Sequence, residues 1–263
     1  MGALGPRPLL LTVGPLLLVL TGLGGCLRLT FAEAALEVTY FGYASFLIED
    51  PHAEVSLLLD PWSEALQRHK VSDEVLASVD LIFISCSLSG HYDPSMLKRL
   101  RKLNPASRVV TSAEVQARLE RERIYAEVAL NGKNLELGGL QLRFTPAQVE
   151  AENLVVGAAG LLLIAGQTAV YYTGPTRYFD PFVLELTQDV DLLLVPITGQ
   201  HRTMDFFEAG KFAKRLAPAR VAPFGYVSWA RQRTTFPEDF LRQFTDPGPP
   251  RPLLLEEGQV LRL

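Results

Sequence analysis

The feature that most limits the fold is a change from short strand signals to strand-and-helix alternation, which occurs twice along the chain. In the first half, a continuous apolar run at 80–85 leads into a helix signal that begins at Pro94. In the second half, a core strand at 190–197 leads into an amphipathic helix at 204–216. Within the body of the chain, sequence rich in Pro and Gly occurs only at 246–252, so no linker separates the halves. The pattern predicts one α/β body in which two sheets pack face to face and carry helices outside.

The composition is that of an ordinary folded chain without a basic surface. The chain has 263 residues, of which 48% are hydrophobic and 21% are charged, so one domain or at most two are expected. Its 25 basic residues are dispersed among 29 acidic ones, which gives a net charge of −4. Such a chain has no dense positive field that would release counterions from a phosphate backbone. Nucleic acid is therefore not an expected partner.

The amino-terminal segment has the composition of a targeting or anchoring sequence. Residues 8–27 form a run of 20 positions without a charge, which is about the length that crosses a hydrocarbon core. Three interpretations stay open besides a start codon placed too early: a retained membrane anchor, a secretory signal cut near 32–34, or a lipoprotein signal that ends at a lipidated Cys26. Each of the three predicts export to the cell envelope, with the membrane as a partner of this segment. The expected organisation is a signal peptide or anchor at 1–26, a short linker at 27–36 and a folded domain at 37–263.

Short motifs at the ends of the expected strands form an ordered set. They are 38–48 (VTYFGYASFLI), 59–62 (LDPW), 84–93 (ISCSLSGHYD), 145–148 (TPAQ), 171–176 (YYTGPT), 195–199 (VPITG), 203–209 (TMDFFEA) and 221–223 (VAP). Together they resemble the metallo-β-lactamase superfamily, most closely its ascorbate-6-phosphate-lactonase-like branch, over about residues 37–263. The resemblance implies a four-layer αβ/βα sandwich, which agrees with the α/β pattern described above.

The resemblance also implies where metal ligands would lie. Enzymes of the family hold one or two ions of the Zn²⁺ class with His and Asp side chains, and a metal-bound hydroxide attacks a lactone, a phosphodiester or a similar bond. In this chain, the family's ligand positions fall on Cys86, Leu88, Gly90, His91, Val149, Pro175 and Gly225 or its neighbour Phe224. Only His91 keeps the family residue, and Leu, Gly, Val and Pro side chains have no donor atom. The histidine that this branch often carries at the position of Tyr43 is missing too.

These changes predict a pseudoenzyme that works without a cofactor. The chain has only four histidines, and none lies within four residues of another. No metal is therefore expected, and the function would be to bind a small anionic ligand or a protein of the cell envelope. The residues expected around the remaining cleft are Tyr43, Asp60, His91, Thr173, Arg177 and His201. Arg177 and His201 would supply the positive charge for an anionic ligand.

Two catalytic alternatives use the loop that follows the apolar run at 80–85. A metal-dependent hydrolase of a lactone or phosphoester would hold a single Zn or Mn ion with His91, Cys86 and either Asp60 or Asp93. An enzyme without a metal would use Cys86 as a nucleophile beside His91. The candidate catalytic residues are thus Cys86, His91 and Asp93.

Overall fold

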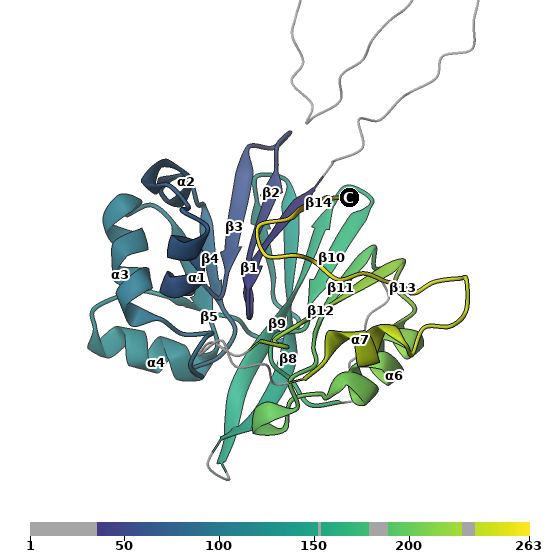
Figure 1. The fold of residues 1–263 in the computed structure, drawn as a ribbon. Coiled ribbons are helices and arrows are strands. Elements are labelled where there is room, and N and C mark those ends of the chain that lie inside the picture. The colour runs from purple at the N-terminus through teal and green to yellow at the C-terminus, as the bar shows by residue number, and fades with distance from the viewer. Residues whose placement is uncertain (1–35, 152–153, 179–188, 228–234) are drawn as a thin grey trace, which may run out of the picture. The chain divides into compact units, whose positions relative to one another are not determined.

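The computed structural model describes four stretches of the chain, residues 36–151, 154–178, 189–227 and 235–263 (Figure 1). The chain divides into two compact units, and all described residues belong to the second, Ala34–Leu263. The expected signal or anchor, the lipidation candidate Cys26 and nearly all of the expected linker lie outside the described residues, and they stay predictions. Among the helices of the described stretches, none is both long enough and apolar enough to cross a membrane.

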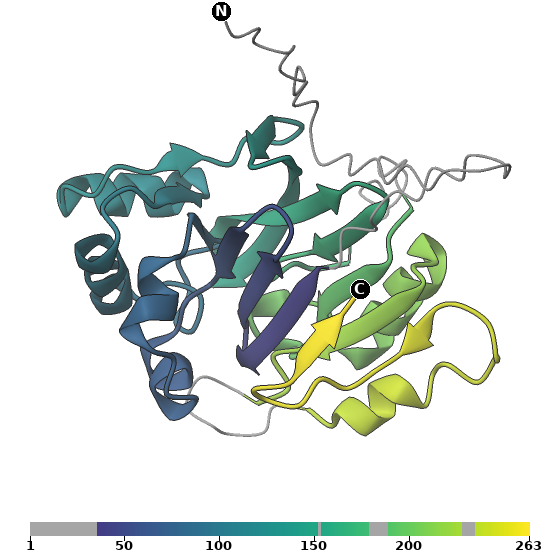
Figure 2. The ribbon, with the colours of Figure 1, turned by 90° about the horizontal axis from the view of Figure 1, so that it is seen from above.

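Two sheets of seven strands each form the middle of the described body (Figure 2). The first sheet has the order β14 (Val260–Arg262), β1 (Glu37–Gly42), β2 (Ser45–Asp50), β3 (Val55–Leu59), β4 (Leu81–Ile84), β5 (Arg108–Thr111) and β6 (Glu127–Val128). The second has the order β13 (Arg251–Pro252), β12 (Arg220–Phe224), β11 (Leu192–Pro196), β10 (Thr168–Tyr172), β9 (Leu154–Ala165), β8 (Leu140–Ala151) and β7 (Asn134–Leu137).

Helices cover the outer face of each sheet. Those on the first sheet are α1 (Ser63–Arg68), α2 (Asp73–Ala77), α3 (Pro94–Leu103) and α4 (Ala113–Arg121), and those on the second are α6 (Phe206–Leu216) and α7 (Pro237–Leu241). Figure 1 shows the two groups on opposite sides of the paired sheets. The layers therefore run helix, sheet, sheet, helix, and the predicted αβ/βα sandwich is confirmed.

The strand β4 shows why this sequence forms the inner layers. Leu81 and Phe83 belong to the core between the two sheets, whereas Ile82 and Ile84 pack under the helices. Successive side chains of a strand point to opposite faces, so a strand that is covered on both faces requires a continuous apolar run. The strand β11 follows the same rule in the second sheet.

Some elements depend on their neighbours more than on local sequence. The helices α1 and α2 have only six and five residues, which is too short for a helical period to stand out in the sequence. The strand β8 continues to Ala151, through the whole motif at 145–148. Because β8 pairs with β9 from Gln141 through Ala151, hairpin pairing sets its length.

Candidate functional site

Strands of both sheets end at one edge of the described body. In the first sheet β3 and β4 are parallel neighbours, and in the second sheet β10, β11 and β12 are parallel neighbours. Parallel strands bring the loops at their carboxyl ends to the same edge of a sheet. The residues that directly follow these five strands are Asp60, Ser85, Thr173, Ile197 and Gly225.

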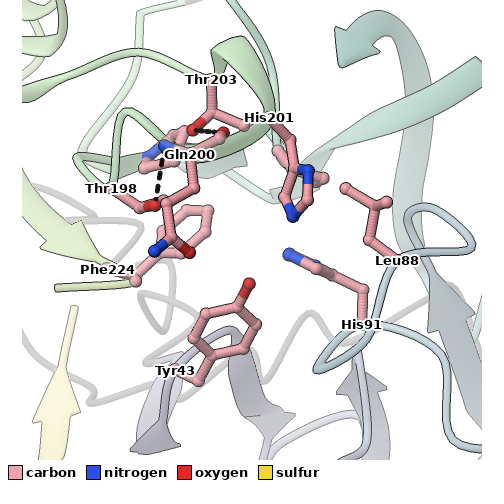
Figure 3. Close-up of a pocket in the computed structure, with 11 residues that line it drawn as sticks. Tyr43, Leu88, His91, Thr198, Gln200, His201, Thr203 and Phe224 are labelled. Atoms are coloured by element: carbon pink, nitrogen blue, oxygen red, sulfur yellow. Dashed lines mark hydrogen bonds between the residues drawn. The ribbon is translucent and has the colours of Figure 1, made fainter. Parts of the chain in front are cut away.

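A small pocket opens among these loops (Figure 3). Its volume is about 10 Å³, which is room for about one water molecule. The residues that line it are Tyr43, Leu88, His91, Pro175, Pro196, Thr198, Gln200, His201, Thr203, Phe224 and Gly225. None of these lining residues carries a carboxylate, an ammonium or a guanidinium group, so the pocket wall has no permanent charge.

The carboxylate of Asp60 is the centre of a buried hydrogen-bond network beneath this pocket. Asp60 is fully buried and has a left-handed backbone with φ of 41°. Its Oδ1 accepts a hydrogen bond of 2.7 Å from the Ser85 backbone N–H. Its Oδ2 accepts hydrogen bonds from the Ser85 hydroxyl at 2.5 Å and from the Tyr172 hydroxyl at 2.6 Å. These donors from both sheets compensate the desolvation of a buried carboxylate.

The same Oδ2 atom orients His91. The Nδ1 atom of His91 lies 2.6 Å from the Asp60 carboxylate, and the side chain is only 4% exposed. Because a carboxylate accepts hydrogen bonds, Nδ1 carries a hydrogen, and in the neutral imidazole Nε2 then keeps its lone pair. Figure 3 shows that the ring projects toward the pocket, so the lone pair of a fixed imidazole is available there.

Tyr43 contributes a hydroxyl group on the neighbouring wall. The residue lies in the turn between β1 and β2 with φ of 53°, and the backbone N–H of Gly225 donates to its carbonyl at 2.9 Å. The ring centroid lies 5.2 Å from that of His91, and the hydroxyl points into the pocket (Figure 3). Burial raises the pKa of the Tyr43 hydroxyl, and the nearby Cys86 and Asp60 raise it further. The hydroxyl therefore stays protonated at neutral pH and can donate a hydrogen bond.

His201 reaches the pocket from the second sheet. It lies in the short turn η1 (Gln200–Arg202), and both His201 and Arg202 have left-handed backbones with φ of 52° and 53°. An ion pair of 2.9 Å between Arg202 and Glu150 of β8 connects this turn to the sheet. Figure 3 shows the His201 ring above the His91 ring, on the opposite side of the pocket.

The candidate nucleophile Cys86 lies away from the pocket surface. It is fully buried, and its Sγ accepts a hydrogen bond of 3.4 Å from the Leu88 backbone N–H. Burial raises the pKa of the Cys86 thiol well above its usual value, and the charge of Asp60 raises it further. The protonated thiol is a poor nucleophile and a poor metal ligand.

We expect the Cys86 thiol to resist alkylation in the folded protein. In a Cys26→Ser variant, which leaves Cys86 as the only thiol, iodoacetamide should react at least about 100-fold more slowly than in the urea-unfolded chain. The rate should also rise about tenfold for each pH unit from pH 7 to pH 9, because the raised pKa keeps most of the thiol protonated and only the small thiolate fraction reacts. Mass spectrometry of timed samples measures both rates. A native rate that levels off within this pH range would contradict the raised pKa of the buried thiol.

The other predicted residues have structural partners near the pocket. Asp93 caps α3, where its carboxylate accepts from the Met96 backbone N–H at 3.0 Å, and it also accepts from Ser63. The Thr173 hydroxyl donates to the Gly174 carbonyl at 2.8 Å. The Arg177 guanidinium lies 3.8 Å from the Glu150 carboxylate, which also pairs with Arg202. Glu150 therefore partly compensates the charge of Arg177, and less positive charge is available to an anionic ligand than the sequence suggests.

The positions where the family has metal ligands divide into two groups. Leu88, His91, Pro175 and Gly225 line the pocket, whereas Cys86, Gly90 and Val149 do not. Within the described ranges, no group of three or more His, Cys, Asp and Glu side chains comes together as a metal site. A two-ion centre therefore does not fit these residues. The pocket offers two imidazoles and one phenol, which is a donor set for one ion at most.

Comparison with known proteins identifies the family. A family model described as a beta-lactamase superfamily domain matches residues 37–225. The chain belongs to the metallo-β-lactamase superfamily. A UPF0173 metal-dependent hydrolase of Thermofilum pendens is 34% identical over 205 residues, which are 76% of this chain and 84% of the relative. Another protein of that name from Methanosarcina mazei is 26% identical over 239 residues, 88% of this chain and 100% of the relative.

Solved structures show the same fold. Igni18, described as a novel metallo hydrolase from Ignicoccus hospitalis, matches with a TM-score of 0.70 and 23% identity, covering 87% of this chain and 98% of Igni18. YhfI of Bacillus subtilis, described as a metallo-beta-lactamase fold protein, matches with a TM-score of 0.68 and 16% identity, covering 88% of this chain and 100% of YhfI. At these identities, the likeness establishes the fold of this superfamily member and not its substrate.

The prediction that the protein has no cofactor is contradicted by these relatives, because those from Thermofilum and Methanosarcina are named metal-dependent hydrolases. They also favour the hydrolase alternative over the pseudoenzyme. The error has a physical reason. The sequence argument counted only the positions at which the family places its ligands, and it expected His201, which lies in another loop, only as a source of positive charge for an anion. The structure places the His201 imidazole on the wall of the same pocket as His91.

Proposed function

We propose that this protein is a metal-dependent hydrolase that acts on a small lactone or phosphoester at the pocket of His91. The observation that carries the proposal is the buried Asp60–His91 pair, in which the carboxylate holds Nδ1 at 2.6 Å and Nε2 is left for the pocket. A carboxylate behind an imidazole is the usual arrangement at a metal-binding histidine, because it fixes the tautomer and raises the basicity of the ligand. The names of the relatives supply the class of reaction.

The residues of the pocket have separate roles in such a reaction. A divalent ion, when bound, supplies a hydroxide at neutral pH by lowering the pKa of its water. Asp60 holds the His91 ring in one tautomer and one orientation. The Tyr43 hydroxyl, which stays protonated, donates a hydrogen bond to the oxyanion that develops as the carbonyl or phosphoryl group is attacked. The apolar side chains of Leu88 and Phe224 keep bulk water from the reacting atoms.

The size of the pocket limits which part of the substrate enters. A volume of about 10 Å³ admits the attacking water but not the body of a substrate. The scissile carbonyl or phosphoryl group therefore approaches the pocket mouth, and the rest of the substrate lies outside.

We expect His91→Ala to lower hydrolysis at least about 100-fold, because it removes the one oriented imidazole of the site. The full chain is assayed against a panel of lactones and phosphoesters with added Zn²⁺ or Mn²⁺, and then with a chelator. The chelator should remove the activity of the unmodified protein. Initial rates for each substrate provide the measurement.

The control is His52→Ala, because His52 is exposed and does not line the pocket. This variant should hydrolyse the same substrates at the unmodified rate. If the unmodified protein hydrolyses no substrate of the panel faster than His91→Ala does, the hydrolase proposal fails. The pseudoenzyme would then be the better account.

A further inference from the structure

A second arginine joins Arg177 at the edge of the pocket. Arg202 is the last residue of η1 and lies in the sequence between His201 and Thr203, which both line the pocket. Arg177 lies in the loop after β10, two positions after Pro175, which is also a lining residue. Both arginines are therefore beside the pocket and not on its wall.

The carboxylate of Glu150 brings the two guanidinium groups together. Its Oε1 lies 3.8 Å from the Nη1 of Arg177, and its Oε2 lies 2.9 Å from the Nε of Arg202. In the part of the chain that the structure describes, the two guanidinium groups have no other ion pair. Two positive groups and one negative group leave one net positive charge. We call Glu150, Arg177 and Arg202 the arginine cluster.

The charges of the arginine cluster differ in their exposure to solvent. The side chains of Arg177 and Arg202 are 45% and 73% exposed, whereas that of Glu150 is only 20% exposed. Each guanidinium is a planar fork with five N–H donors, and one carboxylate can accept from only some of them. The contact between Arg177 and Glu150 is also longer than a hydrogen bond. N–H groups of both arginines are therefore available to a ligand from solvent.

The loops that carry the two arginines are bonded to each other. The backbone N–H of Met204 donates to the carbonyl of Thr176 at 2.8 Å. Arg202 has φ of 53°, in the left-handed region that is unfavourable for a residue with a side chain. Conformations of this kind concentrate at functional sites, where the surrounding structure holds them. The direction of the backbone at Arg202 is thus imposed by tertiary contacts.

The arginine cluster lies where the body of a substrate would be. The pocket has room for about one water molecule, and its wall carries no permanent charge. The part of a substrate that stays beside the mouth of the pocket would meet the net positive charge of the cluster. Guanidinium groups bind the oxygens of phosphate and carboxylate groups through paired, charge-assisted hydrogen bonds.

We infer that Arg177 and Arg202 bind an oxyanion, a phosphate or carboxylate group that the substrate carries apart from the bond that is broken. This inference rests on the proposed function, because it names the substrate class of the same site. The two arginines are then specificity-determining residues, which act through binding and take no part in the cleavage. A substrate with this additional anionic group should be preferred over a compound of the same shape without it.

The first test measures anion binding without any reaction. Inorganic phosphate is titrated into the full chain at constant ionic strength, and heteronuclear NMR signals of the arginine Nε–H groups report binding. We expect saturable binding, which Arg177→Gln and Arg202→Gln should each weaken at least about fivefold. Arg202→Lys should weaken it less than Arg202→Gln does, because lysine keeps the charge but not the planar fork. A titration with acetate distinguishes a carboxylate group from a phosphate group as the preferred oxyanion.

The matched control is Arg242→Gln. Arg242 is 76% exposed and pairs with Asp239 at 2.6 Å, but it follows α7 and does not line the pocket or belong to the arginine cluster. This variant should bind phosphate as the unmodified protein does. Circular dichroism of each variant checks that the fold is retained.

The second test compares two lactones that differ only in one oxyanion group on a side chain, phosphate or carboxylate according to the first test. For the unmodified protein, kcat/KM should be at least about tenfold higher for the anionic lactone. Arg202→Gln should remove most of this preference, chiefly by raising KM for the anionic lactone. Arg242→Gln should keep the preference.

The outcomes distinguish this inference from the proposed function. Equal titrations of the unmodified protein and of both arginine variants, with phosphate and with acetate, would overturn the inference and leave the hydrolase proposal to its own assay. Equal kcat/KM for the two lactones would overturn it while the hydrolase proposal stands. Anion binding that is lost in the arginine variants, without hydrolysis of any substrate, would support the anion site and reject the proposed function.

Discussion

Replacing Asp60 by alanine is expected to lower the free energy of unfolding by about 3–5 kcal/mol, which is a large part of the roughly 5–15 kcal/mol that a domain has in total. Asp60 is fully buried, and it accepts hydrogen bonds from groups of Ser85, His91 and Tyr172. Alanine would leave these buried donors without their acceptor, since Asp60 is the carboxylate that accepts from all of them among the described residues. Urea unfolding followed by circular dichroism gives the difference.

The matched control is Asp205→Ala. Asp205 also accepts hydrogen bonds, from the backbone N–H groups of Phe207 and Glu208 at the start of α6, but it is exposed. Water can replace those bonds, so we expect a loss of about 1 kcal/mol, as is usual for a helix cap. Equal losses for the two variants would mean that burial of the Asp60 network has no special role in stability.

Replacing Gly174 by alanine is expected to lower the free energy of unfolding by about 3–4 kcal/mol, by adding a steric clash to an unfavourable backbone conformation. Gly174 has φ of +65°, and a Cβ atom there would lie 2.4 Å from the backbone oxygen of Ala159. That oxygen is part of the backbone of β9, so it cannot move aside as a flexible side chain would, and the neighbouring Ala159 N–H donates at 2.9 Å to the carbonyl of Ser85 in the loop after β4. The chain must therefore shift at the contact between the two sheets.

Gly166→Ala separates the two contributions. Gly166 has a similar φ of +59°, but a Cβ atom there would meet nothing within 4 Å. We expect a loss of roughly 1–2 kcal/mol, which is the cost of the left-handed conformation alone. The difference between the variants in urea unfolding measures the clash. If Gly174→Ala lost no more than Gly166→Ala, the sheets would be free to move apart at this point.

The clash at Gly174 also has a consequence for the site. Pro175, the next residue, lines the same pocket as His91. A shift of this loop would change the shape of the pocket. We therefore expect the Gly174→Ala chain that remains folded to hydrolyse the panel of lactones and phosphoesters more slowly than Gly166→Ala does.

The regular inner elements of the fold could be predicted because their signals are local. The helix α3 (Pro94–Leu103) begins at Pro94 as the sequence predicts, and in the structure Asp93 caps it. The strand β4 was predicted as a buried strand from its apolar run alone. The short edge strands β6 and β13, with two residues each, exist only through pairing with a neighbour.

The candidate site was predictable only in part. Tyr43, His91 and His201 were expected around the remaining cleft, and all three line the pocket. Cys86 and Asp93 were natural candidates by residue type, but one is a buried thiol and the other caps a helix. Thr198 and Thr203 belong to motifs of the family resemblance, but nothing in those motifs showed that they line the pocket together with Gln200. An ion pair between Arg202 and Glu150 of β8, a strand that is distant in the sequence, helps to hold the loop between them.

The sequence by itself determined the layers of this protein, because the alternation of side chains along a strand and the periodicity of a helix depend on near neighbours only. It also determined which family ligands are missing, since that follows from residue types. Only the tertiary structure decided that Asp60 lies behind His91 and that His201 faces it. These contacts join loops of two different sheets, so they follow from how the sheets pack and from no local pattern in the chain.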